Sequence, residues 1–149
     1  MEKYHYTECG LDNVLIEGIR TTIDDAGDEV LEIPNVRGLH RLLATMIIER
    51  PHGILPKEIR FLRTEMGMTQ AELASLVKKD HQTIGRWERG ETPIEQNAEF
   101  VIRMIARERL NLPDKISAEE MAGWCIPSAE PQLLTVDGSD PENYRPLAA

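Results

Sequence analysis

The stretch that decides the fold is residues 69–90, TQAELASLVKKDHQTIGRWERG. Thr69 and Glu72 have the spacing of a capping box, in which the threonine accepts from a backbone amide and the glutamate reaches back. Asp80 is placed to cap a second helix, and Gly90 is placed to end it because glycine tolerates a positive φ. The pattern therefore predicts two short helices joined by a tight turn.

Apolar side chains recur at helical spacing in both predicted helices, which indicates that each helix packs along one face. In the first helix these residues are Ala71, Leu73, Ala74 and Val77. In the second helix they are Ile84 and Trp87, which lie three residues apart. The remainder of the second helix is mostly polar and is expected to face solvent; it carries His81, Gln82, Arg86 and Arg89.

Residues 55–109 resemble the Xre/Cro family of helix-turn-helix proteins, which includes phage repressors and many antitoxins. The most specific parts of the resemblance are Thr69-Gln70, Leu73-Ala74, Ile84 and Trp87-Glu88-Arg89-Gly90. The resemblance implies that the second helix enters the major groove of double-stranded DNA. It also implies a homodimer whose two copies reach half-sites about one helical turn, roughly 34 Å, apart.

The resemblance further implies which side chains contact DNA. Gln70 matches a family glutamine that holds a DNA phosphate, and the first residues of the second helix match positions that contact base edges. Arg63 and Glu88 match a buried ion pair of the family that holds the motif together without touching DNA. The predicted DNA-binding residues are Gln70, Lys78, Lys79, His81, Gln82, Thr83, Arg86 and Arg89.

The turn departs from the family pattern, because Lys78 stands where the family usually has glycine. A residue with a Cβ must either adopt a strained positive φ or use a slightly different turn. Lys78 and Lys79 are placed to face phosphates. Asp80 brings a negative charge near the DNA, which favours a capping role for it.

The net charge of −9 is distributed unevenly along the chain. Residues 54–109 carry ten basic and nine acidic residues and are therefore +1. Residues 1–53 have five basic and ten acidic residues, and residues 110–149 have two and seven, so each flank is −5. Because DNA affinity depends on local phosphate neutralisation, a motif with this balance on an acidic chain predicts weak non-specific binding and reliance on specific contacts.

Composition excludes several classes of protein. The chain has 149 residues, 41% of them hydrophobic, enough for one ordinary domain with a small appendage. No apolar run is long enough to span a bilayer, and the N-terminus lacks a signal-peptide pattern. Cys9 and Cys125 lie far apart, which argues against a disulfide framework or zinc site and fits a reducing cytosol. We expect a cytoplasmic protein with no membrane partner, metal site or cofactor.

The sequence also lacks the motifs of an enzyme. It contains no grouping of serine, histidine and acid, no glycine-rich phosphate loop and no nucleophile motif. We therefore expect no enzymatic activity and assign no catalytic residues.

The segment before the motif is predicted to form a β unit and a helix. β-branched residues are frequent in residues 14–19 and 19–23, and apolar and acidic residues alternate in residues 29–33. An acidic turn is expected between them, at residues 24–28. They predict a small antiparallel sheet of two or three strands, which needs a helix to pack on. Apolar residues at helical spacing from Val36 to Ile47 predict that helix, with Asn35 as its cap.

Three more helices are expected around and after the motif. Pro56 opens one in which Ile59 and Leu62 face inward. Residues 92–95 have capping-box spacing with proline at the favoured position and predict a helix containing Phe100, Val101, Met104 and Ile105. Residues 117–120 predict a last short helix with Met121, Trp124 and Cys125. From Ile126 onward the chain is expected to be a mobile tail.

The predicted fold class is thus mainly α, with a lambda-repressor-like helix-turn-helix domain and a small N-terminal antiparallel β unit. The expected domains are a β unit plus helix at residues 1–53, the DNA-binding domain at 54–110, and a short helix with a mobile acidic tail at 111–149. This order is similar to that of MqsA-type antitoxins, but the paired cysteines of their zinc site are absent. The resemblance therefore supports the architecture and leaves the toxin partner of that family unassigned.

The function predicted from the sequence is a DNA-binding transcriptional regulator, an autorepressor acting as a homodimer on a palindromic operator. The alternative is an antitoxin that binds a toxin through the β unit or the acidic tail and represses its own operon. The terminal Leu147-Ala148-Ala149 resembles the ending that bacterial proteases recognise, which gives the hypothesis of rapid turnover.

Overall fold

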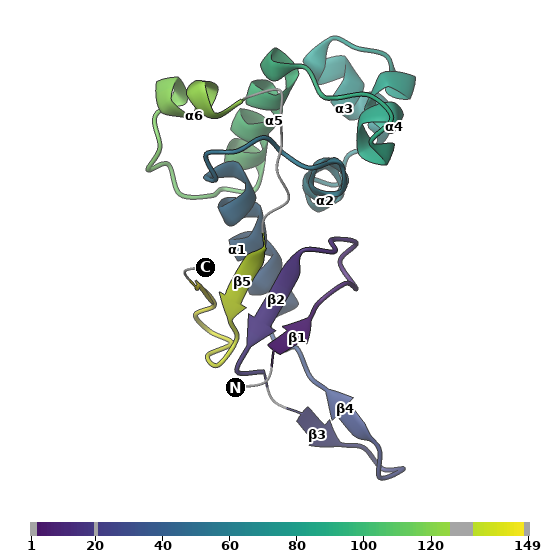
Figure 1. Cartoon of the computed structure of the whole chain (residues 1–149), viewed down its shortest axis with the longest axis vertical. Helices are drawn as coiled ribbons and strands as arrows, with labels where there is room; N and C mark the ends of the chain where they lie inside the picture. The colour runs from purple at the N-terminus through teal and green to yellow at the C-terminus, as the bar shows by residue number, and fades with distance from the viewer. Residues whose placement is uncertain (1–2, 20, 126–132, 148–149) are drawn as a thin grey trace. The chain divides into compact units, whose positions relative to one another are not determined.

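Helices predominate in the computed structural model, which describes residues 3–19, 21–125 and 133–147. The described residues form six helices and six strands (Figure 1). They divide into two compact units, which are described separately. The first unit is Met1–Leu43 with Gln132–Ala149, and the second is Ala44–Pro131. Ala148 and Ala149 of the proposed degradation signal lie outside the described residues.

A four-stranded sheet of order β1-β2-β5-β6 forms the centre of the first unit. Strand β2 (Val14–Glu17) pairs antiparallel with β1 (Lys3–His5) and parallel with β5 (Leu134–Asp137). Strand β6 (Arg145–Pro146) is antiparallel to β5. Since alternate residues of a strand share a face, one apolar face results. Its members are buried and lie opposite one another in register: Val14 with Leu134, and Ile16 with Val136.

A separate two-stranded ribbon consists of β3 (Thr21–Ile23) and β4 (Glu29–Leu31). The acidic turn predicted between them is confirmed. The Asp24 carboxylate accepts from the backbone amides of Ala26 and Asp28 at 3.0 and 2.9 Å, so the aspartate closes its own turn.

The prediction of one antiparallel sheet within residues 13–33 is wrong. β2 does not pair with the ribbon; its neighbours are β1 and the parallel strand β5 (Figure 1). The mobile tail expected from Ile126 onward is also wrong for the described residues that form β5 and β6. Their four- and two-residue patterns are too short to identify a strand, and β5 becomes stable only beside a strand at the other end of the chain.

Helix α1 (Val36–Ile48) follows the ribbon, as predicted. Asn35 caps it: the Asn35 Oδ1 atom accepts from the Gly38 backbone amide at 3.2 Å. The Asn35 Nδ2 group also donates to the Pro141 carbonyl at 2.8 Å, which ties the start of the helix to the C-terminal segment of the first unit. Leu39 and Leu43 are completely buried.

The second unit contains five helices after the end of α1. They are α2 (Pro56–Glu65), α3 (Gln70–Val77), α4 (His81–Arg89), α5 (Gln96–Arg109) and α6 (Ala118–Trp124). Pro56 is the first residue of α2, and Ile59 and Leu62 are buried, as predicted. The core also includes Leu73, Ile84 and Ile102. Ser117 caps α6 by accepting from the Glu120 amide at 3.1 Å, which confirms that prediction.

The capping box predicted at residues 92–95 does not form. Helix α5 begins at Gln96, and Glu95 is its N-cap without a side-chain capping bond. The Glu95 carboxylate instead pairs with the Lys79 ammonium group at 2.7 Å. The side chain that the local pattern assigns to the cap is thus bonded to the turn between α3 and α4.

A buried polar cluster, which the sequence analysis did not identify, fixes α5 in the second unit. The fully buried Arg103 donates to the carbonyls of Ile48 and Arg50 at 2.9 and 3.0 Å. The Glu99 carboxylate accepts from the Ile54 amide at 2.8 Å. Both side chains therefore bond to the segment between α1 and α2, whose backbone groups need partners because they are buried.

Burial changes the acid–base properties of this cluster. It lowers the pKa of Arg103, and the Glu99 charge opposes that shift. Burial, together with the hydrogen bond to Glu99, raises the pKa of the Cys125 thiol to about 12. Cys125 is thus a protonated, unreactive core residue at neutral pH.

Candidate nucleic-acid interface

Helices α3 and α4 begin at the caps that the sequence predicts. Thr69 accepts from the Glu72 amide at 3.1 Å, and the Glu72 carboxylate accepts from the Thr69 amide at 3.2 Å, which completes the capping box. Asp80 accepts from the amide and hydroxyl groups of Thr83 at 2.8 and 3.1 Å. These hydrogen bonds hold the pKa of Asp80 below its usual value. Gly90 ends α4 with a φ of 74°.

Lys78 lies in the turn between these two helices, where the family usually has glycine. Its backbone adopts φ 62° and ψ 41°, the left-handed conformation, so the chain keeps the turn and accepts the strain of a Cβ there. The Lys78 and Lys79 amides both donate to the Ala74 carbonyl, and the bond from Lys79 is 2.9 Å long. The Lys78 side chain is exposed.

An ion pair joins α2 to α4. The Arg63 Nε and Nη2 atoms donate to the two Glu88 carboxylate oxygens at 2.6 and 3.0 Å, and Nη1 donates to the Met68 carbonyl at 2.9 Å. The exposed fractions of the two side chains are only 15% and 5%. The pairing inferred from the resemblance is thus present in bidentate geometry, which fixes orientation as well as distance.

Helix α4 has a buried face and an exposed face. Ile84, Gly85 and Trp87 are buried and pack the helix into the second unit. The opposite side carries exposed polar residues from the predicted set: His81, Gln82, Arg86 and Arg89. Thr83 is half-buried. Helix α4 therefore presents hydrogen-bonding groups to solvent from a fixed backbone.

Three residues of the predicted set bond to acidic neighbours. Gln70 donates to Glu88 at 3.2 Å, beside the Arg63 pair. Lys79 pairs with Glu95 at 2.7 Å, and Arg89 pairs with Glu91 at 3.0 Å. The pair of Arg89 is exposed and that of Lys79 is partly exposed, so solvent screens both and each adds little to the stability of the fold. By contrast, the Gln82 and Arg86 side chains have no hydrogen bond or ion pair within the described residues.

This arrangement of caps, left-handed turn, buried ion pair and exposed second helix agrees with a comparison against protein families. Residues 59–98 match the family described as Helix-turn-helix. The chain contains a helix-turn-helix domain of the Xre/Cro type. No curated protein and no solved structure matches the chain. The helix-turn-helix domain suggests DNA binding and points to a non-catalytic regulator.

A hollow of about 300 Å³ lies within the helix-turn-helix domain, between α2, α3 and α4. Three arginines and a glutamine contribute to its lining, so it is polar and positively charged. The lining residues are Arg60, Arg63, Gln70, Gly85, Glu88 and Arg89. Its residues come from three helices, so no local sequence pattern predicts this hollow.

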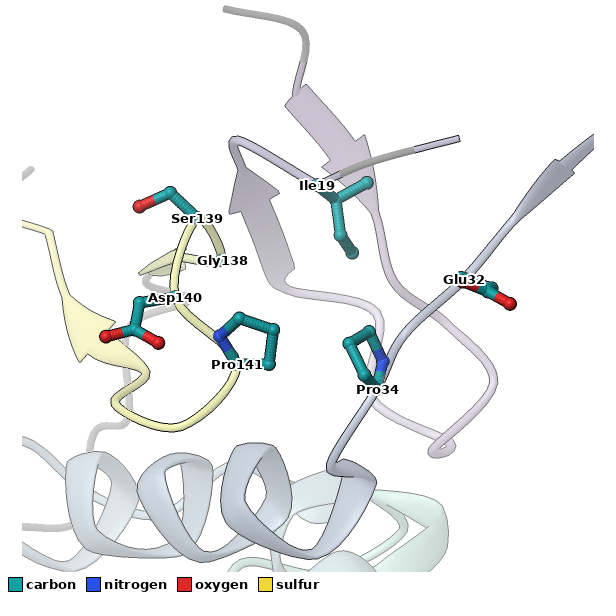
Figure 2. Close-up of a pocket in the computed structure, with 7 residues that line it drawn as sticks. All are labelled: Ile19, Glu32, Pro34, Gly138, Ser139, Asp140 and Pro141. Carbon is teal, nitrogen blue, oxygen red and sulfur yellow. The ribbon is translucent and has the colours of Figure 1, made fainter. Parts of the chain in front are cut away.

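A second hollow, of about 380 Å³, lies in the first unit and is separate from the helix-turn-helix domain. Figure 2 shows Pro34 and Pro141 facing each other across it, with the carboxylates of Glu32 and Asp140 directed away from its centre. The polar groups of this hollow therefore do not converge on a common point, unlike those of a typical ligand site.

Neither a metal cluster nor a membrane-spanning helix is found in the described part of the chain. Within it, no group of three or more histidine, cysteine, aspartate or glutamate side chains is arranged to hold a metal ion. None of the helices in the same ranges has the length and apolar character needed to cross a membrane.

Proposed function

We propose that this protein is a cytoplasmic transcriptional regulator that binds double-stranded DNA sequence-specifically, as a homodimer on a palindromic operator, and represses its own operon. The DNA-binding domain is residues 54–110. The observation that carries the proposal is the exposed face of α4. On this face Gln82 and Arg86 are exposed to solvent and have no hydrogen bond or ion pair within the described residues. Ile84 and Trp87 are buried on the opposite face and hold the helix in place.

The exposed side chains suit the groups that DNA offers in its major groove. Glutamine pairs with the N6 and N7 positions of adenine, and arginine pairs with the O6 and N7 positions of guanine. We therefore assign Gln82 and Arg86 to base contacts, with His81 and Thr83 beside them at the start of α4. Gln70, Lys78, Lys79 and Arg89 are assigned to phosphates.

A homodimer is proposed because one helix can contact too few base pairs to define a DNA site by itself. A single α4 places only a few side chains on base edges, and each good bidentate contact contributes about 1–3 kcal/mol of discrimination. Two copies on a palindrome double the number of contacts and the site length. The acidic flanks favour this arrangement, because they weaken non-specific binding and leave the base contacts to decide the site.

A band-shift experiment on the promoter of the protein's own operon tests the proposal. Wild-type protein should shift this fragment at lower concentration than a fragment of scrambled sequence, and Gln82→Ala/Arg86→Ala should lose the difference. Gln96→Ala/Arg109→Ala is the matched control, because it removes the same residue types from exposed positions of α5. A wild-type protein that does not distinguish the two fragments would refute autorepression.

The dimer requires its own measurement. Light scattering of the purified complex should give two protein chains per operator, and footprinting should find two protected half-sites about one helical turn apart. One chain per operator with a single protected half-site would refute the homodimer.

The ribbon of β3 and β4 favours a second candidate function, that of an antitoxin or adaptor that also binds a protein. Ile23 is 76% exposed and Val30 is 38% exposed, and a ribbon of two short strands is only marginally stable by itself. A partner strand added to this ribbon would cover the apolar residues. The test mixes the protein with the product of the adjacent gene. Ile23→Asp should abolish a complex without changing DNA binding, and failure of wild type to form the complex would exclude that partner.

A further inference from the structure

The ribbon of the first unit combines exposed apolar side chains with negative charge. Residues 21–34, which form the ribbon and the segment after it, contain five acidic residues and no lysine or arginine. Asp25, Asp28 and Glu32 are exposed and have no ion pair within the described residues. Ile23 and Val30 on the same ribbon are 76% and 38% exposed. Exposed apolar side chains surrounded by charge are typical of a site that binds another protein.

The outer edge of β3 has backbone groups that can bond to another strand. The Asp24 amide donates to the Asp28 carbonyl at 2.9 Å, so these two residues form a hydrogen-bonded pair of the ribbon. Such pairs alternate along an antiparallel ribbon, and the next one is Thr22 with Val30. The N–H and C=O groups of Ile23, which lies between them on β3, therefore point away from β4.

The hollow of about 380 Å³ in the first unit lies at the base of this ribbon. Ile19 comes shortly before β3, and Glu32 comes directly after β4, and both line the hollow. Its apolar surface comes from Ile19, Pro34 and Pro141, and the carboxylates of Glu32 and Asp140 are directed outward from it (Figure 2). The hollow and the ribbon thus form one surface, with apolar groups inside and carboxylates around them.

Two backbone contacts hold the walls of the hollow in place. The Gly138 amide donates to the Glu17 carbonyl at 2.6 Å, which fixes one wall to the end of β2. The Asn35 side-chain amide donates to the Pro141 carbonyl at 2.8 Å, which fixes the same loop to the start of α1. The hollow is therefore formed before any partner arrives, and binding does not require this loop to become ordered.

Charge and shape together indicate the kind of molecule that fits this surface. Nucleic acid is repelled by the carboxylates, and a second copy of the chain would bring the same carboxylates to the contact. A small polar molecule is disfavoured because the polar groups of the hollow do not converge. A protein segment with apolar and basic side chains complements both the hollow and the charge around it.

We propose that the ribbon and the hollow together bind an extended segment of another protein that is rich in lysine or arginine. The segment pairs as a strand with the outer edge of β3 and covers Ile23. One of its apolar side chains enters the hollow against Ile19, and its basic side chains lie opposite Glu32 and the acidic turn. The proposal rests on the second candidate function, protein binding by the ribbon. It adds the charge of the partner, the edge that pairs and the hollow as the anchor site.

The first experiment titrates the full chain with a peptide of about eight residues in which valine and lysine alternate, a length typical of a strand. Nuclear magnetic resonance of the backbone amides locates the contact. The amides of Ile23 and of residues 138–140 should shift, while those of α3 and α4 should not. A peptide of the same length in which glutamate replaces lysine is the control and should not bind. Equal binding of the two peptides, or no binding of either, would overturn the proposal.

The second experiment separates the apolar anchor from attraction by charge. Ile19→Asp adds a carboxylate, so attraction by charge alone would become stronger. The proposal instead expects the lysine peptide to bind at least about tenfold more weakly, because an anchor contact is lost. Val36→Asp is the matched control, because Val36 is 43% exposed in the same unit and does not line the hollow. It should bind the peptide as tightly as wild type or more tightly. Undiminished binding by Ile19→Asp would show that the hollow is not the anchor site.

A charge reversal at an exposed residue tests the surface without disturbing the core. Glu32→Lys should weaken binding of the lysine peptide by about two- to fivefold, as expected for an exposed ion pair. Glu108→Lys makes the same change in net charge at an exposed position of α5, in the other unit, and should leave the affinity unchanged. Equal weakening by both variants would mean that the peptide responds only to net charge, and the proposal would be wrong.

Failure of this proposal is distinct from failure of the second candidate function. If the product of the adjacent gene binds wild type while the lysine peptide shifts neither Ile23 nor residues 138–140, the protein has a partner and the proposed docking mode is wrong. If that product does not bind while the lysine peptide shifts these amides, that partner is excluded and the docking mode is supported. If the DNA-free protein is a dimer that Ile23→Asp converts to a monomer, a second copy occupies the ribbon and the proposal is overturned.

Discussion

At the residue scale, the exposed polar side chains of α4 and of the turn before it fall into two classes. One class is proposed to contact bases, and the other is proposed to contact phosphates. Gln82→Ala and Arg86→Ala should each cost about 1–3 kcal/mol on the cognate operator and relax the preference for one base. Lys79→Ala should instead weaken binding to all sequences and lower the salt slope. Fluorescence anisotropy on operator variants measures both effects. Identical behaviour of the two classes would contradict the division into base and phosphate contacts.

Asp80 provides a pH test at the same scale. Hydrogen bonds from Thr83, the backbone amide first and then the hydroxyl, lower its pKa below 3.8 in the folded protein. The carboxylate therefore stabilises the folded state fully above the unfolded value, and this contribution is lost as the pH falls through the lower folded pKa. Asp80→Asn keeps an acceptor at the cap without titrating.

Urea unfolding at a series of pH values measures this contribution. Wild type should exceed Asp80→Asn in stability by the largest margin above pH 3.8, and the margin should shrink as the solution becomes more acidic. A margin that does not change with pH would show that the hydrogen bonds of Asp80 do not depend on its charge.

At the element scale, the turn between α3 and α4 contains strain that one substitution can release. Lys78 has a positive φ, and a left-handed residue with a Cβ costs about 1–2 kcal/mol. Lys78→Gly should raise the free energy of unfolding by up to about 1 kcal/mol, because glycine also gives the unfolded chain more freedom.

Lys79→Gly is the control for this substitution, since Lys79 has the same side chain but does not share the positive φ. It should lower the free energy of unfolding by about 0.5–1 kcal/mol. Denaturant unfolding of both variants measures the difference. Destabilisation by both would mean that the strain at Lys78 is compensated within the turn.

The helix ends also explain which elements were predictable. The capping groups of α3, α4 and α6 lie within three residues of the amides that they bond, so the chain itself supplies both partners. Thr92 and Glu95 have the same spacing, yet α5 starts at Gln96, and the Glu95 carboxylate bonds to Lys79 in the turn before α4. Local spacing therefore predicted three of these four helix starts, and at the fourth the glutamate has a partner outside the helix.

At the scale of the whole molecule, the parallel pairing of β2 and β5 joins the two ends of the chain in the first unit. Val136 on β5 is completely buried, and an aspartate there would place an unpaired charge in the core. Val136→Asp should abolish amide-exchange protection in β2 while α3 and α4 keep theirs, because these helices belong to the other unit. Equal loss of protection in α3 and α4 would show that the two units unfold together.

The sequence by itself determined the helix-turn-helix domain, its caps and the charges on its exposed helix. These depend on neighbours within one or two helical turns, so spacing alone reveals them. Only the tertiary structure decided the partner of β2, the burial of Arg103 and Glu99, the choice of a left-handed Lys78, and the hollow that joins Arg60 to Arg89 and Gly85. Each of these features depends either on contacts between residues far apart in the chain or on a choice between two backbone conformations. A local sequence pattern contains neither kind of information.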